Sequence, residues 1–275
     1  MKCGGCREAR YCTRACQKAH WREHKLLCQQ IQAKRDKKAA RRRELGEALI
    51  EASGRGQLSE VRGLLAAGAD PRYKMEEGEI KGYFPLLVAS QMGHIDVMQA
   101  LLDAEADVNQ VGGQYSVSSL FQAAGYNQPR AIALLVRNGG DVNLASSRGT
   151  TPLNMAVQQG HKEAVIALLE AKAAVNQASN DGAGPVYIAA QDGHADVLKL
   201  LIEAGGDVNK VMEGGISPLM VASHQGHIEC VTNALRKDIN GNTALDAAIH
   251  CKHPAVEAVL RAHIANLEAA ERVGG

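Results

Sequence analysis

The sequence has 275 residues, 45% apolar but only 3% aromatic, so its core must consist mainly of Ala, Leu, Val and Ile, which suits thin helical layers better than a deep enzyme pocket. The net charge of +1 hides an asymmetry, because residues 1–46 carry +10 and the remainder −9. No apolar run is long enough for a membrane helix or a signal peptide, so we expect a soluble intracellular protein, cytoplasmic, nuclear or both, without a membrane partner.

Five of the seven cysteines fall within the first 28 residues. In a reducing compartment such clustering indicates metal ligation rather than disulfides. Thiolate and imidazole donors at this density make Zn²⁺ the expected ion. Unrelated core or surface residues are the weaker alternative, because regular spacing rarely arises by chance. The candidate ligands form three closely spaced pairs: Cys3 with Cys6, Cys12 with Cys16, and His24 with Cys28.

This run resembles the MYND-type zinc finger, in which C-x-x-C, Y-C-x-x-x-C-Q, W-x-x-H-K and a final Cys follow one another. The family normally holds two zinc ions in a cross-braced arrangement and has a further C-x-x-C pair upstream, which this sequence lacks. His20 is a possible substitute, although the family does not generally use that position. The resemblance therefore implies one complete zinc site over 1–28, formed by Cys3, Cys6, His24 and Cys28, and a half site formed by Cys12 and Cys16.

MYND fingers typically bind short proline-containing peptides, and the resemblance implies that Gln17 and Trp21 contact them. Trp21, the one tryptophan of the chain, could equally pack within the finger. A domain this small cannot fold on its apolar core alone, so zinc should supply much of its folding energy.

A basic helical linker is predicted over 29–46, because QQIQAKRDKKAARRR contains good helix formers and no Gly or Pro. Such a run could direct nuclear import or bind phosphate, but we favour a solvated helix. Its seven basic residues are Lys34, Arg35, Lys37, Lys38, Arg41, Arg42 and Arg43.

The remainder, 47–275, is a repeat. The segments FPLLVAS, SSLFQAA, TPLNMAV, GPVYIAA, SPLMVAS and TALDAAI follow one another at spacings of 34, 33, 33, 33 and 26 residues, after a weaker copy, EALIEAS. Each full unit has a Pro at a helix start, a short apolar helix, a Gly-His turn, a second helix and Asp-Val-Asn. Two antiparallel helices and a loop are therefore predicted for each unit.

These units resemble the ankyrin repeat, with its T-P-L-x-x-A opening, G-H turn and A-D-V-N ending. The resemblance implies an all-α solenoid of about seven helix pairs, each stabilised by its neighbours. The third repeat lacks the usual Pro and Gly-His but keeps its length, so we expect normal stacking. The sixth is seven residues short after Leu235, which indicates either a local distortion of the stack or a defective gene model.

No motif indicates catalysis. His94 and Asp96 imitate part of an iron-oxygenase triad, but they occupy the repeat's Gly-His turn, where His usually satisfies backbone groups of the adjoining layer. Cys230 and Cys251 lack the partners of a nucleophile. We thus expect a non-enzymatic adaptor that binds proteins, without a small-molecule substrate. The alternative is a nuclear transcriptional or chromatin cofactor whose basic head directs import or touches nucleic acid.

Contacts on the stack should come from positions that the repeat pattern leaves free, on the first helices and loop tips. On the helices they are Gln91, Met92, Phe121, Gln122, Asn154, Gln158, Gln159, Tyr187, Gln191, Asp192, Met220 and His224; at the tips they are Tyr115, Arg148, Asn180 and Met212.

Overall fold

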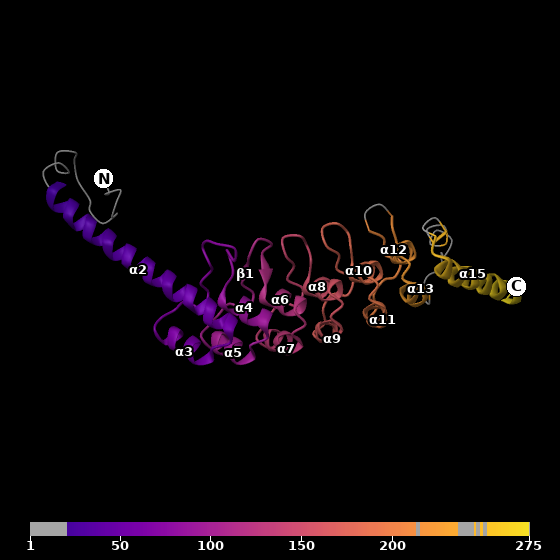
Figure 1. Cartoon of the computed structure of the whole chain (residues 1–275), viewed down its shortest axis with the longest axis horizontal. Coiled ribbons are helices and arrows are strands. Elements are labelled where there is room, and N and C mark those ends of the chain that lie inside the picture. The colour runs from indigo at the N-terminus through magenta and orange to yellow at the C-terminus, as the bar shows by residue number, and fades with distance from the viewer. Residues whose placement is uncertain (1–20, 213–214, 236–244, 246–247, 250–251, 275) are drawn as a thin grey trace.

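The computed structural model is a linear array of helix pairs (Figure 1). It describes residues 21–212, 215–235, 245, 248–249 and 252–274, and side chains within 29–212, 215–234, 245, 248–249 and 252–265. None of the helices in this described part is long and apolar enough to cross a membrane.

The helices form two rows. The inner row begins with the end of α2 (Trp21–Arg55) and continues with α4 (Pro85–Met92), α6 (Ser119–Gly125), α8 (Pro152–Gln158), α10 (Pro185–Gln191) and α12 (Pro218–Gln225). The outer row contains α3 (Leu58–Ala66), α5 (Ile95–Asp103), α7 (Pro129–Arg137), α9 (Lys162–Glu170), α11 (Ala195–Glu203), α13 (Ile228–Leu235) and α15 (Pro254–Gly274). From α2 to α13, each helix contacts the next in its own row and its partner in the other, and α15 contacts α13, so the array is a solenoid, as predicted.

The inner helices begin where the sequence predicts. Pro85, Pro152, Pro185 and Pro218 each occupy the first turn, where the missing N–H costs no hydrogen bond. The hydroxyl of Thr151 caps α8 by accepting from the Asn154 backbone N–H. The third repeat, which lacks the Pro, uses Ser118 in the same way to cap α6.

One continuous core joins the repeats from Leu49 to Leu260, and it consists mainly of Ala, Leu and Val. The largest fully buried side chain among the described residues is Phe84, the residue directly before α4. The described sheet structure is one short antiparallel hairpin in the loop that joins the second repeat to the third. In it, β1 (Val111–Gly112) pairs with β2 (Val117–Ser118), with Val111 opposite Ser118.

Histidines join successive repeats by hydrogen bonds. The ring Nε2 of each lies 2.8–3.2 Å from a backbone carbonyl oxygen of the preceding repeat, and because that oxygen can only accept, Nε2 donates. The donors are His94, His161, His194, His227 and His253, and the acceptors are Gly54, Gly125, Gln158, Gln191 and His224. This confirms the structural interpretation of the Gly-His turn.

The third repeat stacks normally although it lacks Gly-His. Gln128 takes the histidine's place, and its Nε2 donates to the carbonyl of Gln91 at 3.4 Å. Asn127 adopts φ +51°, the left-handed conformation that glycine adopts in the other turns. Asn127 thus reproduces the turn, and Gln128 reproduces the link to the preceding repeat.

Helix α2 runs without a break from Trp21 to Arg55, so it contains the whole predicted linker and also forms the first inner helix. It projects from one end of the stack (Figure 1). At the other end, the shortened part of the sixth repeat falls largely on residues outside the described ones. The stack nevertheless continues, because α15 contacts α13 and His253 bonds to His224.

Candidate interaction surface

The loops between repeats rise above the inner helices along one side of the array (Figure 1). We call the surface formed by the inner helices and these loops the concave face. Several of the predicted contact residues are exposed on it: Met92, Gln158, Gln159, Gln191, Asp192 and His224. Gln91, Gln122 and Met220 are half-buried there.

The prediction of a free side chain is wrong for three of the contact residues. Phe121, Asn154 and Tyr187 occupy the same place in their repeats and are 7%, 0% and 6% exposed. This place lies near the start of the inner helix and is buried in all three repeats. Asn154 is engaged within its own cap, since its Oδ1 accepts from the Thr151 hydroxyl at 3.1 Å.

The loop tips of successive repeats are tied together. The Ser147 N–H donates to the Tyr115 carbonyl at 2.8 Å, and the Asn180 N–H donates to the Arg148 carbonyl at 3.0 Å. The guanidinium carbon of Arg148 lies 4.0 Å from the centroid of the Tyr115 ring, in a cation–π contact. Met212, the fourth predicted tip residue, is half-buried. The tips are therefore an ordered surface in this part of the stack.

Two grooves adjoin on the concave face of the first three repeats. The larger, the α2 groove, has a volume of about 1070 Å³ and lies between α2, the 75–83 loop and α4. Its walls include the apolar side chains of Ile50, Met75, Ile80, Val88 and Met92. Met92 is 52% exposed. Methionine adapts its shape readily, so such a surface can accept more than one apolar partner.

The second, the aromatic groove, has a volume of about 710 Å³ and shares Tyr83 with the first. Besides Tyr83 it is lined by Tyr115, Phe121 and Tyr126, so four of the nine aromatic residues of the chain meet here. They come from two loops and both ends of α6, and they lie far enough apart in the sequence that repeat alignment does not associate them. The sequence signal that could have drawn attention to them is the scarcity of aromatic residues in this chain.

The basic run is partly used within the stack. Arg42 bonds to Asp70 at 2.8 Å, and Arg43 bonds to Glu47 at 2.8 Å and to Glu77 at 3.4 Å. The hydrogen bond and charge of Glu47 raise the pKa of Arg43. The pairs with Asp70 and Glu77 join α2 to the loop of the first repeat, whereas Glu47 lies one turn along α2 itself. The other five predicted basic residues, Lys34, Arg35, Lys37, Lys38 and Arg41, are exposed on the projecting part of α2.

The predicted zinc ligands Cys3, Cys6, Cys12 and Cys16, together with Gln17, lie outside the described residues. Positions 21, 24 and 28, the places of Trp21, His24 and Cys28, lie in the first turns of α2. His24 and Cys28 are thus one helical turn apart in the backbone. Within the described part of the chain, no cluster of His, Cys, Asp or Glu could hold a metal.

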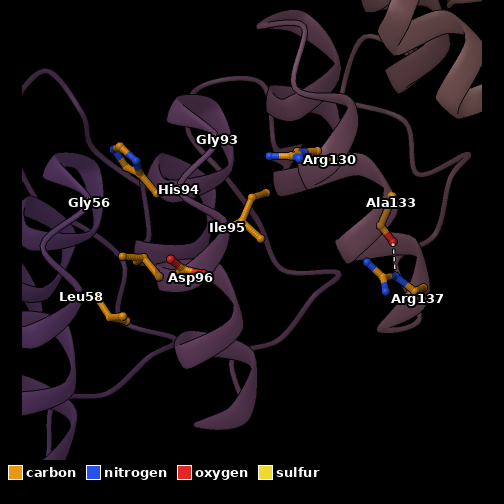
Figure 2. A pocket seen from close by; sticks show the side chains of 10 residues that line it. Gly56, Leu58, Gly93, His94, Ile95, Asp96, Arg130, Ala133 and Arg137 are labelled. Carbon is orange, nitrogen blue, oxygen red and sulfur yellow. Dashed lines mark hydrogen bonds between the residues drawn. The ribbon is translucent and has the colours of Figure 1, made fainter.

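A pocket lined by His94 and Asp96, the pair that matches part of an iron-oxygenase motif, has a volume of about 600 Å³ (Figure 2). The side chains of His94, Asp96, Arg130 and Arg137 do not converge in it. His94 bonds to Gly54, as described, and Arg137 donates to the Ala133 carbonyl at 3.3 Å. His94 therefore serves the stacking of repeats.

Cys230, the other candidate for chemistry that the structure describes, is buried in the core. Burial, and secondarily the charge of Glu229, raises the pKa of its thiol to about 11. A thiol that is protonated and inaccessible at neutral pH is a packing residue rather than a nucleophile. Cys251 lies outside the described residues.

The paired helices, the histidine links and the ordered loop tips define an ankyrin repeat protein. Comparison with protein families agrees: a model of three ankyrin repeats matches residues 120–212, and a single ankyrin repeat matches 81–112. A MYND finger model matches residues 1–28. The chain thus carries an N-terminal MYND finger, which is a zinc-binding domain, followed by ankyrin repeats. Both modules typically mediate protein interactions and are typically non-catalytic.

Proposed function

We propose that this protein is an adaptor that holds one protein on the concave face of its ankyrin stack and a short peptide at its zinc finger. The observation that carries the proposal is the pair of adjoining grooves on the concave face, which leaves Met92, Ile80 and Tyr126 between 41% and 52% exposed. Exposed apolar side chains that gather at one place indicate a binding surface.

The finger is joined to the stack by a helix rather than by a flexible chain. The segment of α2 between positions 28 and 47 would be about 28 Å long at the usual rise per residue. A peptide at the finger and a protein on the stack would therefore be held at a defined separation. Two weak sites on one chain gain affinity from effective concentration when their spacing matches the partner.

Zinc fits the residues that the resemblance assigns to it. Three thiolates and one imidazole, from Cys3, Cys6, Cys28 and His24, are the donors that Zn²⁺ prefers in structural sites. The ion's part would be to fold the finger, and Gln17 and Trp21 would then contact a proline-containing peptide. Cys12 and Cys16 would form the half site.

Quantitative capture of partners from the native cell extract tests this function. The full chain is compared with Met92→Glu, which places a charge in the α2 groove, and with Ile166→Glu on outer helix α9, where Ile166 is also exposed. We expect Met92→Glu to lose partners that Ile166→Glu retains. Equal capture by all three chains would contradict a role for the concave face.

A further inference from the structure

We infer that the aromatic groove recognises an extended, proline-containing segment of a partner protein. The inference rests on the proposed adaptor function and names the chemistry of one of its ligands. It concerns the ankyrin stack and is independent of any peptide bound at the finger.

The groove is built for flat apolar rings. Tyr126, at the end of α6, is 51% exposed, whereas the equivalent positions of the next three repeats carry the polar residues Gln159, Asp192 and Gln225. Tyr115 is 39% exposed at the hairpin tip. Proline rings stack well on aromatic faces, and proline-rich segments typically dock in aromatic-lined grooves.

Its walls are held in place before any ligand arrives. Arg148 packs on Tyr115, and a neighbouring tip bonds to the Tyr115 carbonyl. The Tyr83 ring lies 3.2 Å from the place where a Cβ on Gly113 would be, so the absence of a side chain at Gly113 lets the ring pack against the hairpin. A preorganised wall loses little entropy on binding, and a polyproline helix is itself stiff.

The polar groups at the groove suit a peptide that accepts hydrogen bonds and need not donate them. Gln114 and Gln122 line it with amide groups, and three tyrosines bring hydroxyls. Among the described residues, no hydrogen bond engages the hydroxyls of Tyr83, Tyr115 or Tyr126. A polyproline helix has outward carbonyls without internal hydrogen bonds, and its prolines have no N–H to satisfy.

Aromatic clusters also bind lysine or methylated lysine side chains, but the charges around this groove argue against such a ligand. The lining contains one acid, Glu79, and one base, Lys81. Arg148 already occupies the face of Tyr115 and adds a second positive charge beside the groove. An ammonium ion would therefore meet cations rather than an acidic cage, whereas a proline-containing segment is neutral.

The test measures binding of a fluorescent proline decamer to the full-length chain by fluorescence anisotropy. All measurements use a Trp21→Ala background, which disables the peptide site expected on the finger. We expect Tyr126→Ala to raise the dissociation constant by about tenfold or more, as is typical of a central aromatic contact. Tyr126→Phe, which keeps the ring, should raise it only by about two- to fivefold. Ile166→Ala, an exposed residue of the outer row, should leave it unchanged.

Several results would overturn the inference. These are loss of all decamer binding on Trp21→Ala alone, equal binding of a Gly-Ser decamer, tighter binding of a trimethyl-lysine peptide, or no effect of Tyr126→Ala in a chain that melts like the parent. None of them affects the capture experiment with Met92→Glu, so the adaptor function and the proline preference fail separately.

Discussion

At the scale of single residues, the contact between a histidine and the glycine of the preceding turn explains why both recur. A Cβ on Gly160 would lie 2.7 Å from Cε1 of His194, and Gly193 and Gly226 stand in the same relation to His227 and His253. The glycines are therefore needed for two reasons, a positive φ and the space that the next histidine fills.

Gly160→Ala separates these two reasons when it is compared with Gly205→Ala. Both glycines have positive φ, +68° and +90°, but a Cβ on Gly205 would meet nothing within 4 Å. We expect about 1–2 kcal/mol of destabilisation from backbone strain at Gly205, and about 1 kcal/mol more at Gly160, where His194 must also give up its bond to Gln158. Urea unfolding measures both, and equal losses would show that the histidine contact contributes nothing.

Cys230 predicts a pH dependence of stability. Burial raises its pKa from 9.0 to about 11, so the unfolded chain loses the thiol proton first as the pH rises. Below pH 9 the thiol is protonated in both the folded and the unfolded state, so its contribution to the free energy of unfolding is fully present. Between pH 9 and about 11 this contribution is lost, and the loss is at most about 2–3 kcal/mol. Cys230→Ala should remove this part of the decline in urea unfolding, and parallel curves for the two chains would contradict it.

At the scale of elements, two helical glycines differ in what surrounds them. A Cβ on Gly46 in α2 would lie 2.2 Å from the ring of Tyr73, which is buried against that helix, whereas a Cβ on Gly63 in α3 would meet nothing. Gly46 thus allows the loop of the first repeat to pack on α2, next to the ion pairs of Arg42 and Arg43.

Alanine should consequently have opposite effects at these two positions. Gly63→Ala is expected to stabilise the protein by about 0.5–1 kcal/mol, because alanine is the better helix former. Gly46→Ala is expected to destabilise it by about 1–3 kcal/mol, the usual cost of overpacking, and to speed hydrogen exchange around Tyr73. Thermal unfolding and hydrogen exchange measure the two effects, and stabilisation by both substitutions would show that Tyr73 does not depend on Gly46.

The elements that the sequence predicted well are those with a signal at each end. Pro begins α4, α8, α10 and α12, and a Gly-His turn separates each of these helices from its outer partner. The length of α2 could not be predicted, because residues 29–55 are mostly good helix formers and contain only Gly46 and Gly54 as weak interruptions. Without a stop signal, nothing in the local sequence distinguishes a linker helix from the first repeat helix.

The interaction surface was less predictable than the elements. The repeat pattern shows which positions vary, but not which of them are buried in the stack, and so it wrongly predicts that Phe121, Asn154 and Tyr187 are free. The aromatic groove depends on Tyr83, Tyr115 and Tyr126, which different repeats bring together. Only the stacking of the repeats places these residues side by side.

At the scale of the whole molecule, the zinc content tests the assignment of the finger. We predict about one zinc ion per chain of this sequence, held by Cys3, Cys6, His24 and Cys28. Cys28→Ala should reduce the zinc measured by mass spectrometry to about zero, whereas Cys230→Ala, in the stack, should leave it unchanged. A content near two would contradict the half-site assignment, and none would contradict the site itself.

The central claim is that the concave face, and not the outer row, binds proteins. Site-specific photo-cross-linking in the native cell tests it most directly, with a photoreactive residue placed at Gln122 on the aromatic groove or at Ile166 on outer helix α9. We predict discrete cross-linked proteins from position 122 and only background from position 166. The same proteins from both positions, or products from position 166 alone, would contradict the claim.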